Sequence, residues 1–256
     1  MIDGWRINPQ LGLLETLEAA QLLERKLNAT VNNIANVDTP GYKADRLEFR
    51  EVLMKKIGPK YMRTFKETVP YTVFRPGPVE HTGNPFDLAI AGEGFFKVQT
   101  PHGIAYTRAG DFTIDSQRRL VTPDGYPVLA NGAPIVVDPG LAKGGLVTMR
   151  NIRFNVSPTG VVSVDGTPIG KLDIVTFDNL QKLKKIGKNL FIANGAKEIP
   201  AKNYKVWQGY LEGSNVNPIK EMVRLIQIQR DFQSVQKFIQ GWNETTQRLI
   251  NTATTR

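Results

Sequence analysis

The chain contains no cysteine and only two histidines among its 256 residues. The absence of cysteine excludes disulfide bonds, thiolate metal sites and cysteine nucleophiles, and it leaves the redox compartment open. Only His81 and His102 could supply imidazole ligands, so we expect no zinc or non-haem iron site.

Long apolar runs are also missing. No stretch of the sequence has the length and apolar character needed to cross a bilayer, so we expect a soluble chain without membrane insertion. The first residues, Met1 to Arg6, lack the basic region, apolar run and small-residue cleavage site of a secretory signal peptide. We therefore expect no cleaved signal.

Motifs of enzymatic chemistry are scarce. Gly92-Glu-Gly94 lacks the third glycine of a dinucleotide fingerprint and is interpreted as a bend between strands. Asp111, Asp115 and Asp124 are expected to cap turns, and a hydrolytic carboxylate pair is the alternative. His102 is expected at a hairpin tip. We conclude that an enzyme is not expected.

The formal net charge of +9 raises the alternative of a protein that binds nucleic acid or another polyanion. The densest basic run consists of Lys182, Lys184, Lys185 and Lys188. No zinc finger or sheet of stacking aromatic residues accompanies it. We interpret the run as a solvated face and expect no nucleic-acid partner.

Both ends of the chain carry stripes of mainly apolar residues spaced alternately three and four positions apart. The N-terminal stripe is Leu13, Leu17, Ala20, Glu24, Leu27, Val31 and Ile34. The C-terminal stripe is Leu225, Ile228, Phe232, Val235, Ile239, Trp242, Thr246 and Leu249. Such a stripe stays on one helix face only when the helix packs along another helix. Two core-facing helices of a globular domain are the alternative.

Capping signals set the bounds of these two helices. The first is expected over about 11–36, because Pro40-Gly41 cannot continue it. The last is expected to begin at Pro218 with Asn217 as its N-cap, and to run for roughly 30 residues. Glu221 then lies in the first turn, near the positive end of the helix dipole.

The region between the helices has β character. Short apolar runs from about Thr82 to Gly213 alternate with turn pairs that supply the positive φ angles of tight hairpins. These turn pairs are Asp124-Gly125, Asn131-Gly132, Asp165-Gly166 and Asn194-Gly195. The density of short strands favours an irregular antiparallel β domain over a βαβ arrangement.

The sequence therefore predicts a mainly β chain with long terminal helices that pair as a coiled-coil-like stalk. Residues 1–42 form the N-terminal helix and residues 214–256 the C-terminal helix. Residues 81–213 form the central β domain. Residues 43–80 form a connecting segment that is partly disordered in the monomer, with one or two helical turns around Arg46 to Lys56.

Particular residues carry a family resemblance. Residues 32–43, NNIANVDTPGYK, resemble the N-terminal signature of bacterial flagellar rod and hook proteins, and residues 208–217, QGYLEGSNVN, with 222–230 resemble their C-terminal signature. Residues 87–96 and 106–112 resemble the start of the family's central β domain. The signature positions are Asn33, Ala35, Asn36, Thr39, Pro40, Gly41, Tyr42, Gly209, Ser214, Asn215, Val216 and Asn217.

The resemblance implies a structural subunit of the basal-body rod, the drive shaft that transmits torque to the hook. It implies no enzymatic activity and no cofactor. The terminal helices are expected to line the inner tube of a helical assembly, and a head-to-tail contact that does not close generates such a filament. The implied partners are other copies, other rod subunits and the flagellar export apparatus. The expected assembly interface is Leu13, Leu17, Leu27, Val31, Ile34, Leu225, Ile228, Phe232, Val235, Ile239, Trp242 and Leu249.

Within the family, the short 43–80 region and the central block 168–178 favour the proximal-rod class that adjoins the distal rod. The distal-rod class, whose corresponding segment tends to be longer, is the first alternative, and a divergent hook-related protein is the second. The implied location is the basal body, in the rod that spans the periplasm.

Overall fold

The computed structural model describes residues 9–53, 64–137 and 153–254, with side chains at 16–48, 69–137, 153–248 and 251. The predicted stripe residues Leu13 and Leu249 lie outside the described side chains. The chain divides into two compact units. Residues 1–35, 45–71 and 217–256 form the first, called here the helical unit, and residues 36–44 and 72–216 form the second, the β unit.

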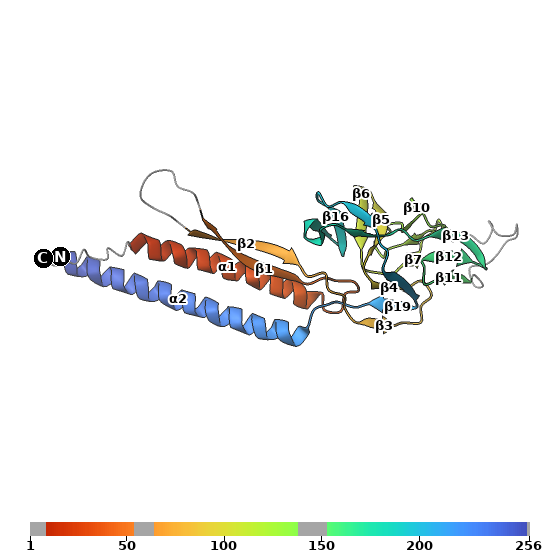
Figure 1. Ribbon diagram of the computed structural model, residues 1–256. Helices are drawn as coiled ribbons and strands as arrows, with labels where there is room; N and C mark the ends of the chain where they lie inside the picture. The colour runs from red at the N-terminus through yellow and green to blue at the C-terminus, as the bar shows by residue number, and fades with distance from the viewer. Residues whose placement is uncertain (1–8, 54–63, 138–152, 255–256) are drawn as a thin grey trace. The chain divides into compact units, whose positions relative to one another are not determined.

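Two long helices dominate the helical unit. Helix α1 spans Pro9–Ala35 and helix α2 spans Pro218–Thr254, which confirms both predicted helices. The Asn217 side chain accepts a hydrogen bond of 3.0 Å from the Lys220 N–H, as an N-cap does. The two helices pack side by side and run in opposite directions (Figure 1).

A β-hairpin completes the helical unit. Strand β1 (Asp45–Leu53) pairs with strand β2 (Thr64–Thr72) and packs against α1. The helical turns predicted around Arg46 to Lys56 are therefore wrong over the described residues. Leu47 and Phe49 alternate with charged neighbours at a period of two, which is the pattern of a strand.

The β unit consists of antiparallel sheets, as predicted. The largest has the order β15 (Leu183–Gly187), β16 (Leu190–Ala193), β6 (Gly103–Thr107), β5 (Phe95–Thr100), β14 (Ile174–Phe177) and β17 (Glu198–Pro200). A second joins β11 (Phe154–Val156), β12 (Val161–Val164) and β13 (Thr167–Lys171). Pairs are formed by β18 (Tyr204–Gln208) with β4 (Leu88–Gly92), β19 (Tyr210–Glu212) with β3 (Val79–His81), β7 (Thr113–Ile114) with β8 (Leu120–Val121), and β9 (Leu129–Ala130) with β10 (Ala133–Pro134). One 3₁₀ turn, Leu180–Lys182, precedes β15.

Two of the four predicted turn pairs have positive φ at both residues, whereas at Asp124-Gly125 and Asn194-Gly195 only the glycine does. Asn131 and Gly132 have φ of 50° and 80°, and Asp165 and Gly166 have φ of 50° and 84°. Both are the positive angles of a type I′ hairpin. His102 lies between β5 and β6, at the predicted hairpin tip.

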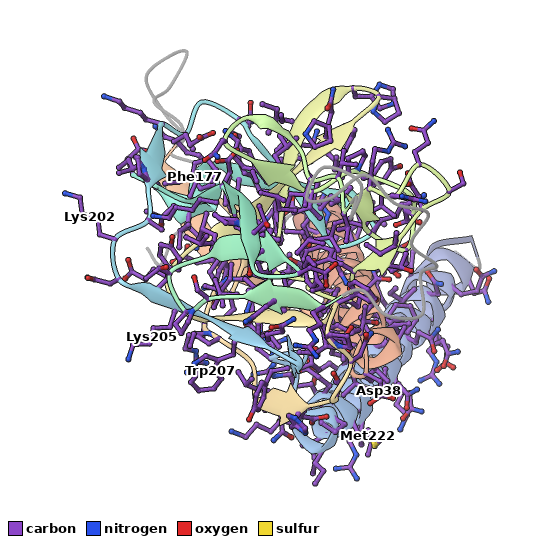
Figure 2. All side chains as sticks on the ribbon, turned by 90° about the vertical axis from the view of Figure 1, so that its right-hand side faces the viewer. Asp38, Phe177, Lys202, Lys205, Trp207 and Met222 are labelled. Atoms are coloured by element: carbon purple, nitrogen blue, oxygen red, sulfur yellow. The ribbon has the colours of Figure 1, made fainter. Side chains whose placement is uncertain are left out.

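Strand β5 separates two hydrophobic cores. Phe96 and Val98 belong to the larger core, whereas Phe95 belongs to a second core with Phe177 and Phe191. Successive side chains of a strand point to opposite faces, so one strand supplies both cores. Phe177, labelled in Figure 2, is buried in the β unit.

Candidate functional site

The signature segments from the two ends of the sequence meet inside the β unit. Tyr42, Ala44 and Val216 form a small buried apolar cluster. The Gly41 N–H donates to the Glu212 carbonyl at 2.6 Å, and the Asn215 N–H donates to the Tyr42 carbonyl at 3.3 Å. Residues 36–44 are thus held against residues 212–216.

Three buried charges lie beside this contact. Lys43 is completely buried and donates from Nζ to Glu212 Oε1 and to the Arg75 carbonyl, the latter at 3.1 Å. Arg108, also buried, donates to Glu212 Oε2 at 3.1 Å. We call Lys43, Arg108, Glu212 and the adjoining Asn215 the junction clamp.

Two cations share one carboxylate in the clamp. Burial lowers the pKa of Lys43, and the attraction of Glu212 opposes this shift. Burial likewise lowers the pKa of Arg108, and the attraction of Glu212 again opposes the shift. The Gly77 N–H adds a third donor to the carboxylate at 3.0 Å. Because breaking one member of a buried ion cluster leaves a charge uncompensated, Glu212 is the member that the clamp tolerates losing least.

Asn215 connects three backbone segments with its side chain. Its Oδ1 accepts from the Ala44 N–H at 2.8 Å. Its Nδ2 donates to the carbonyls of Val73 at 2.7 Å and Arg75 at 2.8 Å. The Val73 N–H donates in turn to the Ala44 carbonyl at 2.8 Å. One amide therefore joins residues 44, 73–75 and 215.

Gly41 is required on two grounds. Its φ is +68°, in the left-handed region that favours glycine. A Cβ at this position would lie 2.2 Å from the backbone nitrogen of Ala109. Any side chain there would push the signature segment away from the β unit.

The other signature residues make local contacts. Thr39 Oγ1 donates to Asn36 Oδ1 at 3.2 Å, and Asn189 Nδ2 donates to the Pro40 carbonyl at 2.9 Å. The Gly209 N–H donates to the Asp87 carbonyl at 2.8 Å, and Ser214 Oγ accepts from the Val216 N–H at 3.3 Å. Ala35 ends helix α1.

A second polar cluster lies in the helical unit. Asn33 is fully buried on α1 and exchanges two hydrogen bonds of 2.9 Å with the backbone of Asp45 on β1. Glu221, fully buried in the first turn of α2, accepts from Arg46 at 3.0 and 2.6 Å and from Arg224 at 2.7 Å. The cluster ties β1 to both helices.

The predicted stripes are divided between inward and outward faces of the helical unit. On α2, Ile228 is buried, Leu225, Val235, Ile239 and Trp242 are half-buried, and Phe232 is 38% exposed. On α1, Leu27 and Ile34 are half-buried, but Leu17 and Val31 are 55% and 47% exposed. Among the described side chains of α1, at residues 16–35, the buried ones are Thr16, Leu23, Thr30 and Asn33.

Helix α2 also has an exposed apolar face that the sequence analysis missed. Its members are Ile219, Met222, Val223 and Ile226, each more than half exposed. They follow one another at intervals of three, one and three residues, so they share one side of the helix. Met222 marks this face in Figure 2. A search for a second apolar stripe, adjacent to the predicted one on the same helix, would have identified this face.

The basic run is only partly a solvated face. Lys182 and Lys184 are exposed. Lys185 donates to the Lys43 carbonyl and lies over the Tyr42 ring, 4.3 Å from its centroid. Lys188 pairs with Asp124 at 2.9 Å. The prediction is therefore wrong for Lys185, which contacts the signature segment.

Two of the three candidate carboxylates form ion pairs with nearby basic residues. Asp115 pairs with Arg119 at 2.7 Å, and Asp124 with Lys188. Burial raises the pKa of Asp111. Within residues 9–53, 64–137 and 153–254, no three carboxylates or imidazoles group as metal ligands would. No helix in those same ranges has the length and apolar character to span a membrane.

Three family models match the chain in order. Residues 15–43 match the model described as flagella basal body rod protein, and residues 89–164 match the flagellar hook protein FlgE/F/G D1 domain. Residues 208–252 match the C-terminal model of flagellar basal body rod FlgEFG proteins. The first and third matches contain the segments that meet at the junction clamp.

Whole-length relatives are similar as well. The flagellar basal-body rod protein FlgF of Caulobacter vibrioides is 36% identical over 241 residues, covering 91% of this chain and 94% of that protein. FlgF of Mesorhizobium japonicum is 30% identical over 246 residues, with coverage of 95% and 98%. The rod protein FlgG of Buchnera aphidicola subsp. Schizaphis graminum is 31% identical over 271 residues, with coverage of 94% and 98%.

Proposed function

The chain belongs to the family of flagellar basal-body rod proteins, and from this premise we propose that it is the proximal-rod subunit that adjoins the distal rod. As a member of that family it is a structural subunit of the rod, and its work is to assemble with other rod components. The observation that carries the assignment is the 36% identity to a FlgF over 91% of the chain.

Alignment lengths support the proximal position. The alignment to the Buchnera FlgG spans 271 positions, more than the 256 residues of this chain, so that FlgG has segments without a counterpart here. The alignments to the two FlgF proteins span 241 and 246 positions. The connecting region of this chain, residues 43–80, is short, and this also favours the proximal class over the distal class.

The terminal helices supply the proposed assembly surfaces. Within one subunit, α1 and α2 pair in a coiled-coil-like manner through Ile228 and its half-buried neighbours. The outward residues then remain for neighbouring subunits: Leu17 and Val31 on α1, and Ile219, Met222, Val223 and Ile226 on α2. Contiguous exposed apolar faces of this kind mark protein–protein contacts.

The remaining features of the proposal follow from the family. The subunit leaves the cell through the flagellar export apparatus without a cleaved signal, and it works without catalysis or a nucleic-acid partner. It polymerises into the axial shaft and passes torque toward the hook.

Deletion of the gene tests the position in the rod. We expect non-motile cells whose basal bodies contain the inner rod and lack the distal rod, visible by electron microscopy of purified basal bodies. Restoring the gene on a plasmid should restore both structures. Basal bodies with a complete distal rod in the deletion strain would contradict the proximal assignment, and normal swimming would contradict a role in the rod.

A further inference from the structure

The polypeptide passes between the helical unit and the β unit four times. The boundaries lie at residues 35/36, 44/45, 71/72 and 216/217. Every covalent path between the two units therefore uses one of these four connections. The β-unit ends of the connections are residues 36, 44, 72 and 216.

The junction clamp holds one of these ends directly and two others through a neighbouring residue. Ala44 is fixed by the Asn215 side chain and by the Val73 N–H, both at 2.8 Å. Val73, one residue beyond the third connection, donates and accepts in the same network. Val216, at the fourth connection, packs on Tyr42 and Ala44.

The first connection is tied to the same network through the short segment 36–44. The Thr39 N–H and hydroxyl bind Asn36, and the Tyr42 N–H donates to the Thr39 carbonyl at 3.3 Å. Gly41 and Lys43 then attach this segment to Glu212, through its carbonyl and carboxylate respectively. All four connections converge on one buried set of ionic and amide contacts.

We propose that the junction clamp, Lys43, Arg108, Glu212 and Asn215, is the anchor through which the β unit resists torque in the assembled rod. This inference rests on the proposed function as a rod subunit. The clamp side chains hydrogen-bond to the backbone at several points. Their charged groups are buried, so water and salt screen the ion pairs little. A force on any one connection is thereby shared with the others before it reaches the strands.

Two variants weaken the clamp in different ways. Lys43→Met removes one of two cations and leaves Arg108 paired with Glu212, so the charges balance and the β unit is expected to fold. Asn215→Ala removes three side-chain hydrogen bonds and leaves all three charges. The matched control is Val162→Ala, at a fully buried core position on β12 outside the clamp. The melting temperature of each variant is measured, and the swimming of clamp variants is compared with that of a control whose melting temperature is lowered by the same amount.

The experiment measures swimming speed in dilute buffer and in viscous medium, where the motor applies greater torque. We expect both clamp variants to swim normally in dilute buffer and to lose most of their speed in viscous medium relative to wild type. The core control should show no extra loss in viscous medium, and Lys43→Arg, which keeps the charge, should restore much of the speed.

Two results would overturn the proposal by different routes. If the deletion strain is non-motile but clamp variants and core control respond equally to viscosity, the clamp is not an anchor and the rod assignment stands. If the deletion strain swims normally, the rod function itself fails. If Lys43→Met does not fold, Asn215→Ala decides between the same outcomes.

Discussion

Lys184 and Lys185 are neighbours on strand β15 but differ in their surroundings. Lys184 is exposed, whereas Lys185 donates to the Lys43 carbonyl and lies over the Tyr42 ring. We expect Lys185→Gln to lower the free energy of unfolding of the β unit by about 1 kcal/mol, because it removes a cation–π contact and weakens a hydrogen bond. Urea unfolding followed by tryptophan fluorescence measures the change.

Lys184→Gln is the matched control, since it makes the same chemical change one residue away. It should leave the unfolding midpoint where it is in wild type. Equal midpoints for both variants would mean that the contact of Lys185 with the signature segment contributes no stability.

Lys43 gives the β unit a specific pH dependence. Burial lowers its pKa from the ordinary value of 10.5, so between the folded and unfolded pKa values the unfolded chain holds more protons than the folded one. Stability therefore rises with pH across that window and stops rising above the unfolded value.

We expect the difference in unfolding free energy between wild type and Lys43→Met to grow in favour of wild type as pH rises toward 10.5. Both proteins share the titrating tyrosines and other lysines, so the difference isolates Lys43. Chemical denaturation at several pH values measures it. A difference that is independent of pH up to 10.5 would contradict a lowered pKa for Lys43.

The sequence identified the signature positions but not what they do. Lys43 and Glu212 stand 169 residues apart, and Asn33 and Glu221 stand 188 apart. No local pattern marks a charge as buried when its partner is so distant. Only the fold places these groups together. Turn residues were predictable because their constraint is local, as at Asn131-Gly132, whereas Lys188 and Asn189 adopt positive φ after Gly187, where the sequence has no Asn-Gly or Asp-Gly pair to signal it.

At the scale of the element, α1 shows why periodicity alone leaves its orientation open. The inward residues Leu23 and Thr30 lie on a stripe adjacent to the predicted one, and both stripes share Leu27 and Ile34. The side chain of Asn33 must face the backbone of Asp45 to form its two hydrogen bonds. This polar contact fixes the rotation of the helix and leaves Leu17 and Val31 outward.

The two faces of α2 should respond differently to the same substitution. Ile228→Asp buries a carboxylate between the helices and should destabilise the packing of α1 on α2 by at least about 3 kcal/mol. Ile226→Asp, two residues away at a side chain 51% exposed, should leave the folded monomer unchanged. Thermal melts monitored by circular dichroism at 222 nm measure the helical unit.

The defect of Ile226→Asp should appear only on assembly. The Ile226→Asp monomer is exported and folded but cannot present its apolar face to a neighbour, so cells carrying it should lack the distal rod and not swim. Both variants should retain a folded β unit. Normal motility with Ile226→Asp would show that this face is not an assembly surface.

At the scale of the whole molecule, the two units differ in how much of their apolar surface is covered. The β unit has two cores of buried side chains, whereas helix α2 has few buried residues along its length. A helix that buries little apolar surface depends on neighbouring molecules for its stability. The helical unit should therefore be the weaker part of an isolated subunit.

Amide hydrogen exchange on a dilute monomer tests this difference and the position of its boundary. We expect weak protection of α1 and α2 and strong protection between residues 85 and 210 over the described strands.

The junction clamp adds a sharper expectation, because residues 36–44 belong to the β unit. Their amides should exchange slowly, as the strands do, although they directly follow a rapidly exchanging helix. Asn215→Ala should release the amide of Ala44, whose acceptor it removes, while amides of β12 stay protected. Uniform protection along the chain would contradict the weak helical unit, and rapid exchange of residues 36–44 in wild type would contradict a clamp that holds them to the β unit.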